Sequence, residues 1–190
     1  KSYEEITSMY SASDEMIDKN RSDVVIGRGI EVGHIFNFGT KYTLPLECYV
    51  LNNEGKKVAP YMGSYGVGVS RLTAAIIEAF HDENGIKWPF NISPFKINII
   101  SSPQASNSEV AEKLLEKLTL KYENVSYDDR DLGMGRKIKD SELIGIPWSI
   151  IIGKKYEESK QFEITNRSNG EKLFLTESEV ESFEFEQYAP

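Results

Sequence analysis

The sequence predicts two domains in series: an α+β domain on an antiparallel sheet in residues 1–92, then an α/β domain with a mixed sheet in residues 93–190. Three observations predict this. In the first half, apolar runs flank the turn residues 52–55, as in a β-hairpin. A glycine-rich run at 63–68 then leads into an amphipathic helical segment. In the second half, predicted strands alternate with predicted helices, a pattern typical of α/β domains.

The first domain is predicted to contain three strands and a helix. Residues 1–20 read as a short helix or a loosely held N-terminal segment, and residues 31–38 as a strand. A second strand at 46–51 enters the hairpin turn, and a third near 58–62 leads to the glycines. The helix that follows has its apolar face at spacings of three and four: Leu72, Ala75, Ile76, Ala79 and Phe80.

The second domain is predicted to begin after the prolines at 89 and 94. Its first helix is expected to be capped by Ser106 and Glu109 and to bury Val110, Leu114 and Leu118. The remaining elements follow in chain order: strand 95–101 before that helix, then strand 125–127, helix 139–144, a fully buried strand 148–153, and a hairpin of 162–165 with 172–175.

The glycine run is the strongest candidate for a binding site. Gly63, Gly66 and Gly68 lack a Cβ, so the backbone could lie against a planar base, and Arg71 presents a guanidinium suited to phosphate oxygens. The run is neither a P-loop, which ends in Gly-Lys-Ser/Thr, nor a Rossmann fingerprint, whose glycine order differs. A glycine-rich strand packed closely under a helix is the structural alternative.

Composition limits the function classes. The net charge of −8 argues against a general polyanion binder, although Arg130, Arg136, Lys137 and Lys139 form a local basic group. The single cysteine, Cys48, excludes a disulfide framework and a cysteine-based zinc site, which suits a reducing cytoplasm. No apolar stretch has the length of a membrane span. The chain opens on Lys1, and we therefore expect a fragment.

The motifs together resemble a known family. The segments 29–36, 39–42, 63–72 and 81–89 are similar, in that order, to bacterial prolyl-tRNA synthetase, and the glycine-arginine run looks like motif 3 of the class II aminoacyl-tRNA synthetases. Residues 127–147 resemble the anticodon-binding domain of the same enzyme. The resemblance implies the C-terminal part of a class II catalytic domain followed by an anticodon-binding domain. Motifs 1 and 2 are not found in the chain.

The resemblance also implies a reaction and its site. Proline and ATP would form prolyl-adenylate, and the prolyl group would pass to tRNA for proline. Arg71 would be catalytic, and ATP would bind at Gly63, Gly66, Gly68 and Arg71, with Mg²⁺ accompanying ATP and no zinc. L-proline would bind at Gly33, His34 and Ser64. The full enzyme would be a cytoplasmic homodimer with no membrane contact, whereas this fragment alone would be inactive because motifs 1 and 2 are missing.

For the second domain the resemblance implies anticodon contacts by Arg130, Arg136 and Lys137. We expect Lys137 to read a guanine edge and Arg130 to organise the loop. Two alternatives remain open. One is a non-catalytic relative that keeps the scaffold as an RNA-binding or regulatory module, and the other is an unrelated α/β enzyme with a glycine loop.

Overall fold

A computed structural model describes residues 28–186 of the 190-residue chain, apart from the side chains of residues 105 and 106. Contacts between Cα atoms divide the chain into residues 1–31 and residues 32–190. Of the first unit only residues 28–31 are described, and they have no regular secondary structure. The helix expected in residues 1–20 lies outside the described residues.

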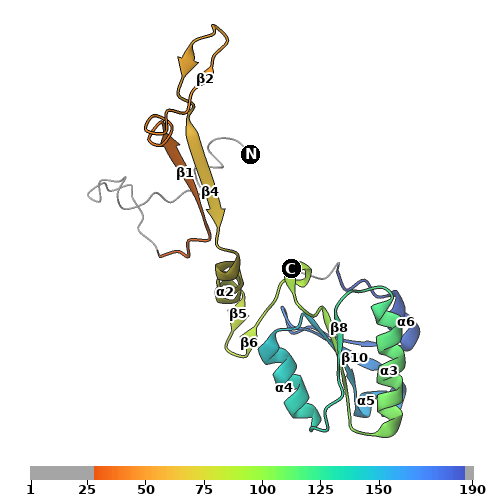
Figure 1. The fold of residues 1–190 in the computed structure, drawn as a ribbon. Coiled ribbons are helices and arrows are strands. Elements are labelled where there is room, and N and C mark those ends of the chain that lie inside the picture. The colour runs from red at the N-terminus through yellow and green to blue at the C-terminus, as the bar shows by residue number, and fades with distance from the viewer. Residues whose placement is uncertain (1–27, 187–190) are drawn as a thin grey trace. The chain divides into compact units, whose positions relative to one another are not determined.

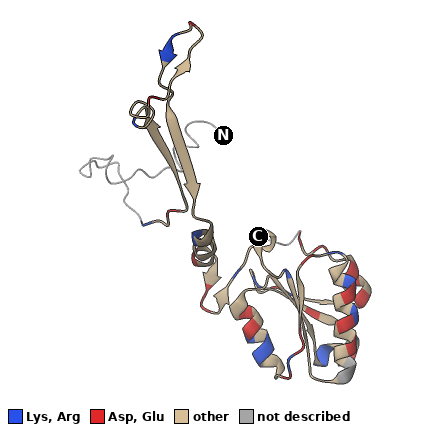
Figure 2. Ribbon diagram, viewed as in Figure 1, with Lys and Arg blue, Asp and Glu red and all other residues tan. Residues whose placement is uncertain are grey.

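The second unit begins with a long antiparallel pair of strands (Figure 1). Strand β1 (Gly33–Gly39) pairs with β4 (Met62–Val67), and the register shifts between Asn37 and Gly39. Between them, β2 (Val50–Leu51) and β3 (Lys57–Val58) form the predicted hairpin. Helix α2 (Val69–Ala79) follows β4 directly, with Gly68 at its N-cap. Neither β1 nor β4 carries a charged residue (Figure 2).

Two strand predictions in this region were wrong in their bounds. The strand expected at 46–51 is reduced to two residues, because residues 40–47 form turns. The third strand was expected near 58–62, before the glycines, whereas the glycine run itself is strand β4. Glycine has a low strand propensity, so pairing with β1 sets this conformation and the local sequence does not.

After α2 the chain makes a small hairpin and a single turn of helix. The hairpin consists of β5 (His81–Asp82) and β6 (Gly85–Ile86), and the 3₁₀ turn η1 spans Phe90–Ile92. Asp82 accepts a hydrogen bond from the backbone N–H of Asn84 at 2.9 Å, which fixes the turn between the two strands. Phe90 is 1% exposed and belongs to the hydrophobic core of the residues that follow.

The rest of the chain is an α/β unit on a mixed five-stranded sheet, as predicted. The strands are β7 (Ile97–Ser101), β8 (Val125–Asp128), β9 (Trp148–Ile152), β10 (Phe162–Asn166) and β11 (Lys172–Leu175), in the order β11-β10-β9-β7-β8. Strand β7 is parallel to β8 and β9, whereas β9, β10 and β11 are antiparallel neighbours. The sheet therefore joins a βαβ arrangement to the predicted terminal hairpin.

Helices cover both faces of this sheet (Figure 1). Helix α4 (Met134–Ile144) lies on one face, and α3 (Ala105–Thr119) and α6 (Glu177–Ser182) lie on the other, with α5 (Lys154–Ser159) against β10. The core lies on the α3 side: Leu114 and Leu118 of α3 meet buried strand residues, among them Ile97, Ile99 and Trp148. The predicted buried face of this helix is confirmed, with Val110 packed at its margin.

Several predictions of the second half need correction. Helix α3 begins one residue before Ser106, with Gln104 at its N-cap and no side-chain cap, so the capping pair of Ser106 and Glu109 was wrong. Helix α4 begins at Met134, five residues before the predicted start, because Gly133 and Gly135 weaken the helical signal there. In β9, residues Ser149 and Ile151 are only half-buried, so the strand is not fully buried.

Two short helices were missed. Helix α6 had a readable signal, because Thr176 and Glu179 form a capping box: the Glu179 carboxylate accepts the Thr176 backbone N–H at 2.8 Å. Its buried residue Val180 is 0% exposed and closes the core. Helix α5, only six residues long, has no side-chain cap.

Candidate functional site

The pairing of β1 with β4 brings together residues that the sequence analysis placed in one site. His34 lies opposite Gly66, and Phe36 lies opposite Ser64. Opposed residues of an antiparallel pair project to the same face, so His34, Ser64 and Gly66 share one face. Gly33 and Gly63 alternate with them and belong to the opposite face.

The shared face has two distinct halves. On β1 the rings of His34 and Phe36 stack, with centroids 4.0 Å apart and an interplanar angle of 9°, and Phe38 continues the row. On β4 the neighbouring positions are small. The result is a ridge of flat rings beside a low floor, an arrangement suited to a small or planar ligand. Phe36 and Phe38 were not predicted as site residues, although their spacing of two from one another and from His34 places all three side chains on one face of a strand.

The glycines of the run have different surroundings. A Cβ on Gly66 would meet no atom within 4 Å, so the backbone beside His34 is open to a ligand. A Cβ on Gly33 would come within 3.2 Å of the carbonyl oxygen of Gly66, and one on Gly63 within 3.3 Å of that of Phe36. Close approach of the two strands accounts for Gly33 and Gly63, as in the structural alternative.

Arg71 is the third residue of α2, and the first part of its side chain lies beside Gly68, which follows β4. The backbone N–H of Gly68 donates to the carbonyl oxygen of Val32 at 2.9 Å, which anchors the turn from strand to helix. A Cβ on Gly68 would lie 3.3 Å from the Cβ of Arg71. A glycine at this position therefore leaves room for Arg71 over the start of the helix.

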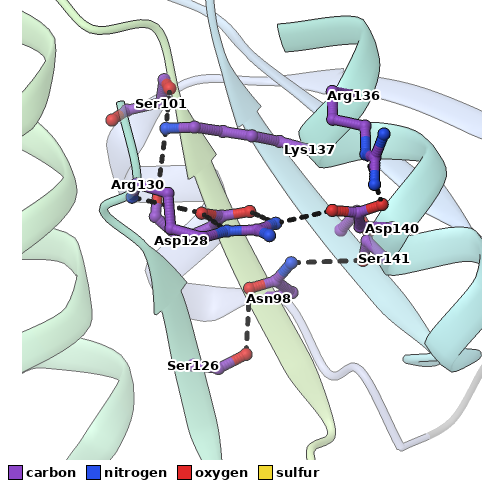
Figure 3. A network of polar contacts seen from close by, with 10 residues as sticks. Asn98, Ser101, Ser126, Asp128, Arg130, Arg136, Lys137, Asp140 and Ser141 are labelled. Atoms are coloured by element: carbon purple, nitrogen blue, oxygen red, sulfur yellow. Dashed lines mark hydrogen bonds and ion pairs between the residues drawn. The ribbon is translucent and has the colours of Figure 1, made fainter. Parts of the chain in front are cut away.

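A second cluster lies where β8 ends and α4 begins (Figure 3). The guanidinium of Arg130 donates to both carboxylate oxygens of Asp128, at 2.8 and 2.7 Å, and also pairs with Asp140 at 3.0 Å. Arg136 donates to the other oxygen of Asp140 at 3.0 Å. The hydrogen bonds from Arg130 lower the pKa of Asp128 below its ordinary value. The four side chains thus form an alternating chain of acid and base, with Arg130 and Arg136 exposed.

Lys137 has a different position from the other two predicted anticodon residues. Its side chain is 1% exposed, and its ammonium donates to the backbone carbonyls of Ser101 at 3.1 Å and Asp128 at 3.0 Å (Figure 3). These carbonyls lie at the ends of β7 and β8. Sequence reasoning assigned Lys137 to a guanine edge, but a buried ammonium with two backbone partners presents no such surface in this arrangement. Lys137 instead joins two strand ends to α4.

A cavity of about 430 Å³ lies beside Arg130, between β8 and α4. Its floor is polar, because Asn98 donates to Ser141 at 3.2 Å and accepts from Ser126 at 2.9 Å (Figure 3). Its wall includes the exposed apolar side chains of Phe95 and Leu143. Its charged lining consists of Arg130 with Asp128, Asp129 and Asp140, so an unstacked base would meet an apolar wall, a polar floor and one guanidinium.

The described residues contain neither a metal-binding cluster nor a membrane-spanning helix. Within that part of the chain, no three His, Cys, Asp or Glu side chains are grouped so that they could hold a metal ion. Among the helices of residues 28–186, none is long and apolar enough to cross a membrane.

Comparison with known proteins identifies the second half first. Residues 92–185 match the family model of the anticodon binding domain, so this part of the chain belongs to that class of domain. The chain as a whole is then compared with complete proteins. It is 44% identical over 173 residues to a proline–tRNA ligase of Wolbachia sp. subsp. Drosophila simulans, an alignment that covers 88% of this chain and 40% of that protein. The resemblance to prolyl-tRNA synthetase predicted from the motifs is confirmed.

Solved structures agree on the fold. The prolyl-tRNA synthetase of Cryptosporidium parvum, in complex with halofuginone and AMPPNP, superposes with a TM-score of 0.72 at 20% identity and covers 80% of this chain and 32% of its own. The enzyme from Giardia lamblia, in complex with prolyl-adenylate, gives 0.65 at 26% identity over 79% of this chain and 33% of its own. This chain thus spans about 40% of the length of the curated relatives it matches.

Proposed function

We propose that this chain is the C-terminal part of a proline–tRNA ligase. The complete enzyme would join proline to ATP, with a proline carboxylate oxygen bonding to the α-phosphorus as pyrophosphate leaves, and would then transfer the prolyl group to a ribose hydroxyl of tRNA for proline. The observation that carries the proposal is the 44% identity over 173 residues, which includes both candidate sites. A non-catalytic module is less well supported, because the relatives matched are ligases by name.

The face formed by β1 and β4 would bind the small substrates. His34 and Ser64 would border the proline site, with Gly33 behind them in the strand pair, and the open backbone at Gly66 would allow a ligand to approach closely. ATP would extend along Gly66 and Gly68 to Arg71, whose charge would stabilise the outer phosphates and the developing charge of the transition state, while Gly63 would allow the close strand pairing that forms this face. Mg²⁺ would enter with ATP, and zinc would not be required.

The cluster around Arg130 would bind the anticodon. Arg130 and Arg136 are exposed, Arg130 lines the cavity, and Arg136 pairs with Asp140, which also lines it, so these two arginines are the residues proposed to contact RNA. Lys137 would act through them as a positioning residue, because its ammonium holds the carbonyl of Asp128, and the carboxylate of Asp128 holds Arg130. The domain boundary is proposed at residues 92 and 93. The complete enzyme is proposed to be a cytoplasmic homodimer.

The proposal is tested by proline-dependent exchange of pyrophosphate into ATP, measured on the complete enzyme and its Arg71→Ala variant. We expect exchange with proline and none with other amino acids such as leucine. The variant should be slower by about 10²–10³-fold, the usual effect of removing one preorganised charge contact. A complete, folded protein without proline-dependent exchange would favour the non-catalytic module.

A further inference from the structure

The hairpin β5–β6 is joined to the sheet of the α/β unit by a bidentate ion pair. The guanidinium of Arg167, just after β10, donates to the two carboxylate oxygens of Asp82 at 2.7 and 2.6 Å. The Arg167 side chain is 11% exposed. This pairing lowers the pKa of Asp82 well below its ordinary value. The partners are 85 residues apart in sequence, so the contact connects two distant parts of the chain.

Arg167 also contacts two backbone carbonyls. Its Nε donates to the carbonyl of Glu142 at 3.1 Å, and one terminal nitrogen donates to that of Gly85 at 3.2 Å. Glu142 lies in the last turn of α4, where carbonyls have no partner within the helix and a cation is favoured by the helix dipole. Arg167 therefore meets the hairpin and the end of α4 with one side chain.

The hairpin and Trp88, which follows it, also contact the end of α4 directly. The indole N–H of Trp88 donates to the carbonyl of Ile144 at 3.0 Å, and the Trp88 backbone N–H donates to that of Gly145 at 3.2 Å. A Cβ on Gly85 would lie 2.6 Å from the Cα of Leu143, and one on Gly145 would overlap the carbonyl of Ile86. Two glycines thus allow the two backbones to meet with no side chain between them.

We propose that Asp82 and Arg167 form a latch that couples the anticodon-binding domain to the end of the motif 3 helix. The hairpin follows α2, which carries Arg71 in its first turn, and α4 carries Arg136 and Lys137 in its first turn and contacts the hairpin with its last. A single helix therefore links the proposed anticodon site to the segment that continues the proposed ATP site. The inference rests on the proposed function for its catalytic consequence only.

The geometry requires arginine at position 167. One planar guanidinium donates four hydrogen bonds, two to Asp82 and one each to the carbonyls of Glu142 and Gly85. The ammonium group of a lysine, on its flexible side chain, does not reproduce this planar arrangement of donors. Arg167→Lys keeps the charge and loses the geometry, while Asp82→Asn keeps the shape and loses the charge. A matched control is the ion pair of Lys172 with Glu163, which joins adjacent strands at 2.6 Å and includes no hairpin residue.

Hydrogen–deuterium exchange of the complete enzyme tests the latch without reference to activity. In Arg167→Lys and Asp82→Asn we expect amides of residues 81–89 and of the last turn of α4 to exchange about tenfold faster, because local opening depends on the contacts that close the segment. Lys172→Met should leave both segments unchanged. Unchanged exchange in both latch variants would overturn the proposal, whether or not the enzyme activates proline.

Kinetics test the coupling. We expect both latch variants to keep proline-dependent exchange and tRNA affinity within about twofold of the parent, while the rate of tRNA charging falls about tenfold, since small misplacements of a bound substrate slow transfer. The Lys172→Met control should charge tRNA at the parental rate. An equal loss of pyrophosphate exchange and tRNA charging would contradict coupling, since it would mean that the variants damage the catalytic site itself.

Discussion

The ammonium nitrogen of Lys137 lies 3.0 Å from the backbone carbonyl oxygen of Asp128, the residue whose carboxylate holds Arg130. Lys137 is buried, while Arg130 is exposed. The relationship explains why basic residues close in sequence serve different purposes. Lys137 fixes the backbone at the end of β8, and Arg130, two residues after that end, is exposed to solvent.

Replacing Lys137 with Met should destabilise the protein. The change leaves the carbonyls of Ser101 and Asp128 without their donor in a buried region, a loss of about 1–3 kcal/mol. Lys139→Met, on the exposed side of the same helix, is the matched control and should change stability by less than about 0.5 kcal/mol. Urea unfolding measures both. Equal stability of the two variants would contradict a structural role for Lys137.

Arg130 and Arg136 should differ in their effect on tRNA binding. Arg130→Ala disrupts the arrangement around Asp128 and Asp140 and should cost about 1–3 kcal/mol of discrimination against a tRNA with a substituted anticodon base. Arg136→Ala, at a more exposed position, should weaken both tRNAs alike and reduce the salt dependence. Binding of the two tRNAs at two salt concentrations separates the effects. Loss of discrimination in Arg136→Ala alone would reverse the assignment.

The sequence predicts the site residues that belong to recognisable motifs, and it misses the residues whose role depends on partners far away in the chain. The register of β1 and β4 makes neighbours of His34 and Gly66, which the motifs placed in one site. The burial of Lys137 was not predictable, because its partners are carbonyls up to 36 residues away and the local pattern of charges resembles an exposed helix. The role of Arg167 was not predictable for the same reason, since its partner Asp82 belongs to a distant hairpin.

Gly145→Ala should destabilise the protein more than Gly170→Ala. Both glycines have positive φ, +84° and +73°, so both substitutions add a backbone cost of about 1–2 kcal/mol. Only at Gly145 would the new methyl group overlap the backbone of Ile86, whereas nothing lies near Gly170. We expect an additional loss of at least about 2 kcal/mol at Gly145, measured by denaturant unfolding. Equal losses would mean that the hairpin does not press on the end of α4.

His34→Ala should raise the KM for proline about tenfold in the complete enzyme, with the KM for ATP within about twofold, as expected when one substrate contact is lost. Pyrophosphate exchange at varied proline and ATP measures both constants. His81→Ala is the control, because the ring of His81 contacts backbone carbonyls at the end of α2. A raised KM for ATP alone would place His34 outside the proline site.

The Asp82–Arg167 pair should make stability depend on pH. The pKa of Asp82 is lowered in the folded state, so the unfolded state binds the proton first as pH falls. The pair therefore stabilises the folded state fully when the pH is above the ordinary pKa of a carboxyl group, and this stabilisation decreases as the pH falls below that pKa. Between about pH 5 and pH 2, the free energy of unfolding should fall less steeply in Asp82→Asn than in the parent. Identical slopes would show that the pair contributes nothing to folding.

The secondary structure was predictable where the hydrophobic pattern was strong. The prediction failed where glycines interrupt the pattern or where the element is short. The apolar runs of β7, β9 and the terminal hairpin were readable, and so was the buried face of α3. Glycines at 63, 66, 133 and 135 carry no periodic signal, so strand β4 and the first turn of α4 depend on tertiary contacts.

The most direct test of the central claim is the charging of tRNA for proline by the complete enzyme that contains this chain. We predict that labelled proline is attached to that tRNA in an ATP-dependent reaction, and that substituting an anticodon guanine lowers kcat/KM by at least about tenfold. Failure of a folded, complete protein to form prolyl-tRNA, while it still binds the tRNA, would contradict the account.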